Sequence, residues 1–455
     1  MSVTSVNAGR VPALASDPAD VDATYRKITW RLIPFIGLLW LLAWIDRINV
    51  GYVKLTMMAD LQWSETVYGL GAGIFFLGYF FFEVPSNLLL QKIGAKKTLM
   101  RITIGWGLTC MAMMFVTTPT MFYLLRFLMG AFEAGFQPGV ILYLTFWYPS
   151  DRRAKAFGMF MAASALAGVI GGPLAGTILN DMQGVNGWRS WQWVFLIEGI
   201  PSVLAGFATW FYLTDRPDQA KWLSAAEQRL VREELARDDH ALGHREHSVL
   251  SALKDRRLWL MILIYFCIVA ANATLNFYGP SVVRELGFTN PATIGWIMSG
   301  AFLLGAGAQI ANGFHSDRQH EVRWHCAIAV TIGALGMLAV ALLIKVSAPL
   351  ALLALTIAVI GTSSAFPVFW QMPNRILSGA AAAVGVAVIN SIANLAGFGA
   401  PFMLGAVKTA TGQLSPGLLV IAAVEIVAAI LIIKFIPRLH RPAKAPAASV
   451  STSRS

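Results

Sequence analysis

Four charged residues inside long apolar segments are the part of this sequence best suited to chemistry. Asp46 and Arg47 are adjacent in "WLLAWIDRINVGY", and Arg126 and Glu133 lie seven residues apart. Seven residues make two helical turns, so Arg126 and Glu133 share one face. Adjacent residues point in different directions, so Asp46 and Arg47 can reach different partners. A guanidinium can hold a carboxylate through two hydrogen bonds, and Asp and Glu can carry protons.

Burial in hydrocarbon makes such residues costly. A charge at the bilayer centre costs about 2.5–3.5 kcal/mol, so it usually faces a cavity and is paired there. The four charges sum to zero, so an empty site can neutralise itself and still present two guanidinium groups. We predict a proton-coupled site for a small organic anion. The alternative is a set of structural ion pairs that hold two helices together.

The elements that position these residues follow from composition. Of 455 residues, 56% are hydrophobic and 13% are charged, against about 25% charged in soluble domains. A membrane span needs about 20 mostly apolar residues. We predict an all-α polytopic membrane protein with twelve transmembrane helices, near 30–51, 66–90, 97–117, 120–147, 155–179, 191–213, 258–282, 293–314, 324–346, 349–372, 380–407 and 416–436.

The net charge of +11 is explained by topology. With the N-terminus inside, 28 of the 35 Lys and Arg residues fall in segments on the cytoplasmic side, as the positive-inside rule requires. We expect both termini to be cytoplasmic in a bacterial-type inner membrane, with anionic lipid rather than nucleic acid as the charged partner. The residues assigned to outer loops are Lys54, Arg189, Arg284, Lys345 and Lys408.

Other classes of protein receive little support. The three cysteines lie in apolar segments, which argues against a disulfide framework or a metal centre. No metal-ligand cluster, nucleophile triad or phosphate loop is present, so we expect neither an enzyme nor a bound cofactor. The chain is expected to be a monomer.

The twelve spans fall into two halves of six that share similar sequence motifs. We predict a cytoplasmic segment (1–28), a six-helix half (29–213), a central loop (214–257), a second half (258–437) and a tail (438–455). Gln91-Lys92 aligns with Asp317-Arg318 at nearly the same offset that aligns Pro173 with Pro401. Such parallel repeats place a site at the interface of the halves. In the loop, Ser224 and Glu227 have the spacing of a capping box, which predicts a short surface helix.

Several motifs resemble one family closely. They are "DRINVG", "EVPSNLLLQKIGAKK", "LRFLMGAFEAGFQPG", "LTFWYPSDRRAKA", "GWRSWQWVFLIEGIPSVL", "FPVFWQMP" and "GVAVINSIANLAGFGAP". With the 6+6 layout, they resemble the major facilitator superfamily, and within it the anion:cation symporter family, over residues 25–438. That resemblance implies uptake of an organic anion with protons by alternating access.

The resemblance also implies roles for particular residues. Arg47 and Arg126 match the family's substrate-anion arginines, and Asp46 and Glu133 match its protonatable carboxylates. Tyr79 matches a substrate contact. Trp44 stands where sugar-acid members tend to have tyrosine, and Ser164 where they tend to have a long amide, so we expect an aromatic or sparsely hydroxylated carboxylate.

The C-terminal half offers polar but uncharged candidates. Trp370, Gln371 and Asn390 are the predicted substrate contacts there, with Asn272, Asn276 and Asn394 as further cavity candidates. Asn390 could instead serve interhelical hydrogen bonding, and Trp370 could be an interface anchor.

Residues at the ends of spans two and eight are expected to serve conformational change. These are Glu83, as a gate or packing contact, and the turn residues Lys92, Gly94, Asp317 and Arg318. Glu198 and Glu425, in spans six and twelve, are interpreted as structural.

The main alternative function is proton-driven antiport or export. Gly168, Gly172, Pro173 and Gly176 in "GVIGGPLAG" resemble a motif of drug/proton antiporters. Glycines of this kind chiefly permit close helix packing, and two buried arginines fit a cationic drug poorly.

Overall fold

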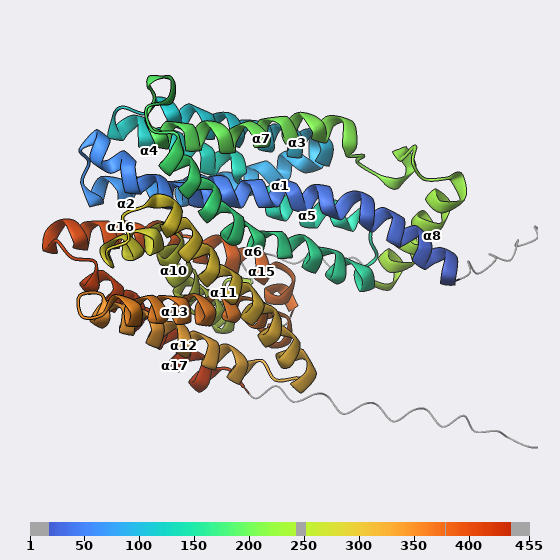
Figure 1. The fold of residues 1–455 in the computed structure, drawn as a ribbon. Helices are drawn as coiled ribbons and strands as arrows, with labels where there is room; N and C mark the ends of the chain where they lie inside the picture. Colours follow the sequence, from blue (N-terminus) through green and yellow to red (C-terminus); the bar gives the residue numbers. More distant parts are fainter. Residues whose placement is uncertain (1–17, 243–251, 378, 438–455) are drawn as a thin grey trace, which may run out of the picture.

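The computed structural model describes residues 18–242, 252–377 and 379–437, and the described chain folds into helices joined by short connections (Figure 1). Twelve of its segments are long and apolar enough to cross a membrane. The prediction of an all-α polytopic protein with twelve spans is therefore confirmed.

The first six spans contain seven α-helices, because span four is broken. They are α1 (Pro18–Leu61), α2 (Glu65–Ile93), α3 (Ala95–Ala112) with η1 (Met113–Phe115), α4 (Pro119–Glu133), α5 (Phe136–Thr145), α6 (Ser150–Asp181) and α7 (Ser190–Tyr212). The short η2 (Val185–Gly187) lies between the last two. The break between α4 and α5 is made at Gly135, whose φ of 83° is left-handed and costs glycine little.

The last six spans contain eight α-helices. They are α10 (Arg256–Glu285), α11 (Pro291–Gln319), α12 (Arg323–Leu343), α13 (Ala348–Phe369), α14 (Gln371–Ile376), α15 (Gly379–Ala393), α16 (Ala396–Thr411) and α17 (Ser415–Phe435). Spans ten and eleven are each interrupted, at Trp370 and near Leu395.

The predicted capping box is present in the segment between the two sets of spans. This segment contains η3 (Pro217–Gln219) and α8 (Ala225–Leu242). The Glu227 amide donates to Ser224 Oγ at 3.2 Å, and the Ser224 amide donates to Glu227 Oε2 at 2.7 Å. Lys27 of α1 pairs with Glu227 at 2.9 Å, so α8 is held against the start of α1.

The helices form two groups, α1–α7 and α10–α17, which lie one above the other in Figure 1. We call the end of the bundle with the loops 62–64, 286–290 and 412–414 the outer end, and the end where α1 begins the inner end. The names follow the predicted topology.

Close packing between the groups explains the glycine and proline motifs. A Cβ added to Gly172 of α6 would lie 2.6 Å from the Gly295 carbonyl oxygen of α11. A matching contact between the groups is formed by α2 and α16, where Gly69 lies against the Pro401 carbonyl. The two segments that share an offset in the sequence therefore make matching contacts between the groups.

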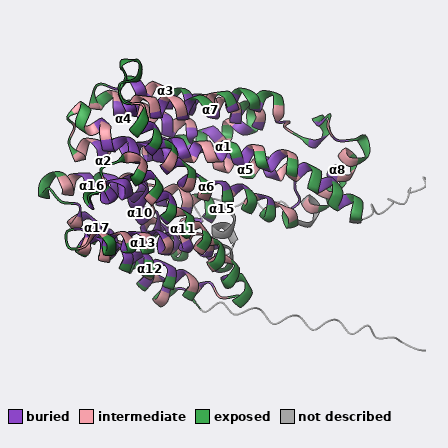
Figure 2. Cartoon of the chain, in the orientation of Figure 1, coloured by how far each residue is buried: buried purple, intermediate pink, exposed green. Residues whose placement is uncertain are grey.

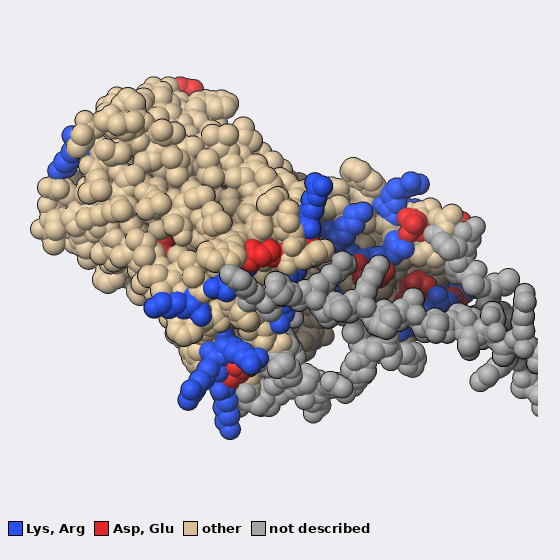
Figure 3. Space-filling model, turned by 90° about the horizontal axis from the view of Figure 1, so that it is seen from below, with Lys and Arg blue, Asp and Glu red and all other residues tan. Residues whose placement is uncertain are grey.

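The surface matches a membrane setting. Figure 2 shows the buried residues between helices, and Figure 3 shows Lys and Arg gathered at one end of a largely uncharged surface. Large exposed apolar side chains include Phe211, Trp296 and Phe314, and exposed apolar patches of this kind suit contact with lipid.

Three basic residues assigned from the sequence to outer loops lie in helices instead: Lys54 in α1, Arg284 in α10 and Lys408 in α16. The first span was expected near 30–51, with Lys54 in an outer loop. In the structure α1 continues to Leu61, and Lys54 is a helical residue that is only 5% exposed. The residues after position 51 remain helical, and Lys54 is accommodated there by an ion pair with Glu65 of α2.

Candidate functional site

The centre of the candidate site is an ion pair between Arg47 of α1 and Glu133, the last residue of α4. The Arg47 guanidinium donates to Glu133 Oε1. Glu133 is fully buried, and its second oxygen, Oε2, has no hydrogen-bond partner. A buried carboxylate is costly unless it is paired, and among the described residues Arg47 is the direct ion-pair partner of Glu133.

Aromatic rings surround the Arg47 side chain. Its guanidinium carbon lies 4.6 Å from the ring centre of Trp44, 5.1 Å from Phe75 and 5.6 Å from Tyr79. Cation–π contacts of this kind stabilise a guanidinium in a desolvated place. Arg47 is thus held in position without saturating its donors, and its Nε remains unpaired.

Arg126 is placed differently from Arg47. It is 0% exposed, and its Nε and Nη2 donate to the carbonyl oxygens of Gly71 and Ala72 in α2, each at 3.3 Å. Its guanidinium lies 5.0 Å from the Phe75 ring. Arg126 therefore joins α4 to α2, and Phe75 lies beside both arginines.

Asp46 is separated from this cluster. Ser202 of α7 donates to its Oδ2 at 2.6 Å, and the Cys110 thiol of α3 lies 3.4 Å from its Oδ1. Both of these partners are neutral and belong to helices of the first group. The four charged residues predicted to act together thus occupy two environments, one around Arg47 and one around Asp46.

The other predicted contacts of the first group also have defined positions. The Trp44 indole nitrogen is buried without a hydrogen-bond partner, beside Arg47. Tyr79 is buried at 4% exposure. The Ser164 hydroxyl donates to the Met161 carbonyl of its own helix at 2.7 Å, so it is already satisfied within α6.

In the second group, an aromatic cluster stands where only Trp370 was predicted. Tyr265 of α10 stacks on Phe369 with ring centres 4.7 Å apart and meets Trp370 edge-on at 4.8 Å. Tyr265 was missed by sequence reasoning, although it is a polar aromatic in an apolar span. Gln371 accepts from Arg375 one turn later, at 3.3 Å.

The two asparagines of α10, Asn272 and Asn276, form a hydrogen bond with each other. Asn276 donates to the Asn272 side-chain oxygen at 3.1 Å. In α15, Asn390 is half-buried, and its neighbour Ser391 donates to Glu83 Oε2 of α2 at 2.6 Å. The predicted gate residue Glu83 thus makes a direct contact between the two helix groups.

The turn residues have separate roles. Gly94 alone links α2 to α3, with φ 90° and ψ 162°, a conformation that other residues avoid. A Cβ there would lie 3.0 Å from the Asp215 carboxylate, which accepts from the Lys96 amide at 2.7 Å. Lys92, Asp317 and Arg318 are exposed at the ends of α2 and α11.

Two further buried carboxylates lie away from Arg47. Glu425 accepts from Thr362 at 2.9 Å, which suits the structural role expected for it. Both oxygens of Glu198 are buried and lack a hydrogen-bond partner.

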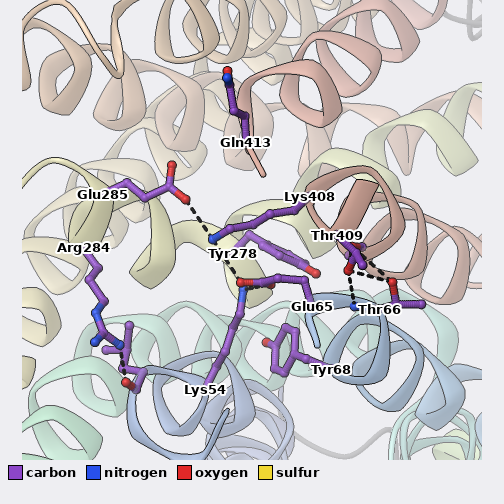
Figure 4. A network of polar contacts seen from close by, with 12 residues as sticks. Lys54, Glu65, Thr66, Tyr68, Tyr278, Arg284, Glu285, Lys408, Thr409 and Gln413 are labelled. Carbon is purple, nitrogen blue, oxygen red and sulfur yellow. Dashed lines mark hydrogen bonds and ion pairs between the residues drawn. The ribbon is translucent and has the colours of Figure 1, made fainter. Parts of the chain in front are cut away.

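Sequence reasoning also missed a charged cluster at the outer end, which we call the outer-end cluster (Figure 4). Its members come from four helices and are Lys54, Glu65, Arg284, Glu285 and Lys408. Three were expected as separate outer-loop charges, and their pairing could not be read from the sequence because the helices are distant along the chain. Among the described residues, no group of three or more His, Cys, Asp or Glu could hold a metal ion.

Known proteins resemble this chain over most of its length. Residues 36–401 match the family model described as Major Facilitator Superfamily. A "Putative tartrate transporter" of Agrobacterium vitis is 44% identical, over 89% of this chain and 93% of that protein. A "Quinolone resistance transporter" of Acinetobacter baumannii is 40% identical, over 91% and 95%.

A solved structure supports the fold alone. The bacterial homologue of the human lysosomal transporter Spinster, in an inward-facing and occupied conformation, aligns with a TM-score of 0.74 at 17% identity. The alignment covers 90% of this chain and 96% of that one.

Proposed function

Because the chain belongs to the Major Facilitator Superfamily and is a multi-pass membrane transporter, we propose that it takes up a small organic carboxylate together with protons. Transport would cross a bacterial inner membrane by alternating access, with both termini cytoplasmic and the chain acting as a monomer. The observation that carries this proposal is the Arg47–Glu133 ion pair, in which the buried Glu133 carboxylate pairs directly with Arg47 and, among the described residues, with no other cation.

Exchange of partners at Arg47 provides the coupling. A substrate carboxylate that binds the Arg47 guanidinium competes directly with Glu133. A displaced Glu133 would be a buried, uncompensated charge, which is strongly disfavoured, so it takes up a proton. Linkage is reciprocal: protonation of Glu133 must increase the affinity for the anion by the same factor.

Asp46 is proposed as a second proton site. Its partners Ser202 and Cys110 are neutral, so its charge is not balanced by a direct ion pair. With both carboxyl groups protonated and a monoanion bound, the site carries one net positive charge. Inward movement of that charge gains about 2.3 kcal/mol per 100 mV of membrane potential.

Arg126 would contribute to the anion site from its place against α2. Its hydrogen bonds to the Gly71 and Ala72 carbonyls keep it buried beside Phe75, within the field of the site. On this account Arg47 exchanges partners during transport, whereas Arg126 supplies a fixed positive charge.

The surroundings favour an aromatic or sparsely hydroxylated acid. Trp44, Phe75 and Tyr79 surround Arg47, and Trp370 with Tyr265 is proposed to contact the substrate from the second helix group. The Ser164 hydroxyl is engaged by its own helix and offers little to a sugar acid. Gln371 and Asn390 are the proposed hydrogen-bonding contacts in that group.

Export by proton-driven antiport is the second candidate, favoured by the name of the quinolone resistance relative. Against it, the glycines of "GVIGGPLAG" have a packing explanation, since Gly172 faces the Gly295 carbonyl. A buried guanidinium in the site also suits an anion better than a cation.

Proteoliposomes with a fixed membrane potential test the proposal. Aromatic and hydroxylated carboxylates should accumulate when the outside is acidic, and much less without the pH gradient. Glu133→Gln should bind substrate but fail to concentrate it. Concentration by Glu133→Gln on a pH gradient alone would refute proton carriage by Glu133, and drug efflux without carboxylate uptake would establish the antiport alternative.

A further inference from the structure

The outer-end cluster contains a carboxylate that lies between two ammonium groups (Figure 4). Glu65 Oε2 is 2.6 Å from Lys54 Nζ, and Glu65 Oε1 is 3.0 Å from Lys408 Nζ. Lys408 also pairs with Glu285 at 2.8 Å. Lys54 and Glu65 belong to α1 and α2, whereas Glu285 and Lys408 belong to α10 and α16.

The Glu65–Lys408 contact crosses between the two helix groups. Among the described residues it is the only ion pair that joins α1–α7 to α10–α17. Thr66 Oγ1 donates to Thr409 Oγ1 at 2.8 Å, and the Tyr68 hydroxyl donates to the Phe277 carbonyl at 2.9 Å, so further cross-group bonds surround it. Polar contacts between the two groups therefore close the outer end, and within the described residues one of them is an ion pair.

Burial strengthens the Lys54–Glu65 pair, which lies within the first group. The Lys54 ammonium lies 4.0 Å from the Tyr278 ring and 4.6 Å from the Tyr68 ring, and Lys54 is 5% exposed. Charges in such a place interact strongly, because water screens them little.

The cluster also lines a pocket with excess positive charge. The pocket has a volume of about 320 Å³, and apart from the five charged residues it is lined by Leu55, Met58, Ala59 and Ser281. Three cations and two carboxylates leave one net positive charge. The Arg284 guanidinium donates to the Leu55 carbonyl, so it too spans the two groups, and within the described parts of the chain it forms no ion pair with a carboxylate.

We propose that the outer-end cluster is an anion-docking gate: Glu65 closes it by binding Lys408, and when the gate parts, a ligand carboxylate from outside takes the place of Glu65. This inference deepens the proposed function and rests on it for the ligand's identity. When the groups separate, Glu65 remains with Lys54 in the first group. Lys408 then retains Glu285 as its partner in the second group, and Arg284 has no carboxylate partner among the described residues. Their surplus positive charge attracts a carboxylate toward the path to Arg47.

The closing role is tested by thiol accessibility, which needs no transport. Asn276 is buried, and its carbonyl lies against Gly51 of α1, so it reports separation of the groups below the gate. In a chain with Cys110, Cys267 and Cys326 changed to serine, Asn276→Cys is labelled from outside with a membrane-impermeant maleimide.

Glu65→Gln and Lys408→Gln remove the same contact from opposite sides, and each should increase the labelling rate at least several-fold. Arg189→Gln is the matched control, because Arg189 and Asp60 form an outer-end pair, 3.6 Å apart, within the first group. Parent-like labelling in both glutamine variants, or equal acceleration in Arg189→Gln, would overturn the gate.

The docking role is tested with charged thiol reagents at Ser281→Cys in the pocket. The measured quantity is the ratio of rates for an anionic and a cationic methanethiosulfonate. Glu65→Gln should raise this ratio and Lys408→Gln should lower it, although both loosen the gate. Equal ratios in the two variants would refute docking while leaving the gate intact.

Competition distinguishes a carboxylate site from a general positive field. Benzoate, a monoanion like chloride, should slow the anionic reagent in the parent chain more than chloride does at equal concentration, and this difference should disappear in Lys408→Gln. Equal slowing by benzoate and chloride would refute a carboxylate site. Because neither readout requires uptake, failure of proton-coupled transport remains distinguishable from failure of the gate.

Discussion

Asp46 and Arg47 are adjacent in α1, yet their side chains enter different environments. Arg47 binds Glu133 of α4 among aromatic rings, whereas Asp46 is held by Ser202 of α7 and Cys110 of α3. The two neighbours thus divide the proposed site into an anion-binding part and a separate buried carboxyl group, and mutations should separate their effects.

Arg47→Lys should reduce the apparent affinity for the anion at least about tenfold, equivalent to about 1.4 kcal/mol. A lysine keeps the charge but loses the planar fork and the ring contacts. Uptake kinetics and the melting temperature should be measured together. Near-normal affinity in a well-folded Arg47→Lys protein would show that Arg47 is structural.

Arg126→Lys should reduce stability as well as transport. Arg126 is fully buried, and its guanidinium donates to the Gly71 and Ala72 carbonyls. A lysine ammonium at this place would not reproduce both hydrogen bonds and would be a buried donor group left partly unsatisfied, which costs about 1–3 kcal/mol, so the melting temperature should fall more than in Arg47→Lys. Equal melting temperatures in the two variants would contradict this difference.

Asp46→Asn should retain substrate binding but lose accumulation, because the amide keeps the shape and cannot carry a proton. Ser202→Ala removes only the hydrogen bond to Asp46 and should retain proton-driven accumulation at a reduced rate. Binding by calorimetry and uptake with a pH gradient provide the two readouts. Full accumulation by Asp46→Asn would exclude Asp46 from proton transfer.

Gly94→Ala should destabilise the protein by about 1–3 kcal/mol, the range for a residue forced into a sparsely populated backbone region. The added methyl group would also press on Asp215. Gly158→Ala is the control, since a Cβ added at Gly158 would meet nothing within 4 Å. Thermal unfolding with the two variants side by side should show a loss only for Gly94.

The cap of α8 should weaken in acid. Burial raises the pKa of Glu227, but the Ser224 amide and hydroxyl and the Lys27 ammonium together outweigh burial and hold the pKa below its ordinary value. A lowered pKa means that the carboxylate stabilises the fold above the ordinary value of about 4.3, and that this contribution is lost as pH falls below it. Hydrogen exchange of α8, corrected for intrinsic rates, should rise with acidification more steeply than in Glu227→Gln.

The sequence by itself determined the elements. Apolar runs fixed twelve spans because each must satisfy its own backbone hydrogen bonds in hydrocarbon. Ser224 and Glu227 predicted the α8 cap because that signal is local. The repeat of Pro173 and Pro401 indicated two related halves. The sequence also indicated Arg47 and Glu133 as candidate site residues, since ionisable residues in apolar spans are rare.

Only the tertiary structure decided the partners. Helical periodicity predicts that the Asp46 and Arg47 side chains point in different directions, but it does not indicate which helix packs against each side chain. Arg126 donates a hydrogen bond to a carbonyl of α2. Lys54, which was expected in a loop, is buried and forms an ion pair with Glu65. These contacts join residues that are far apart in the chain. They depend on how the helices are rotated and packed against one another. Gly172 and Gly69 contribute to that packing, because each lets a helix of one group approach the backbone of the other group closely.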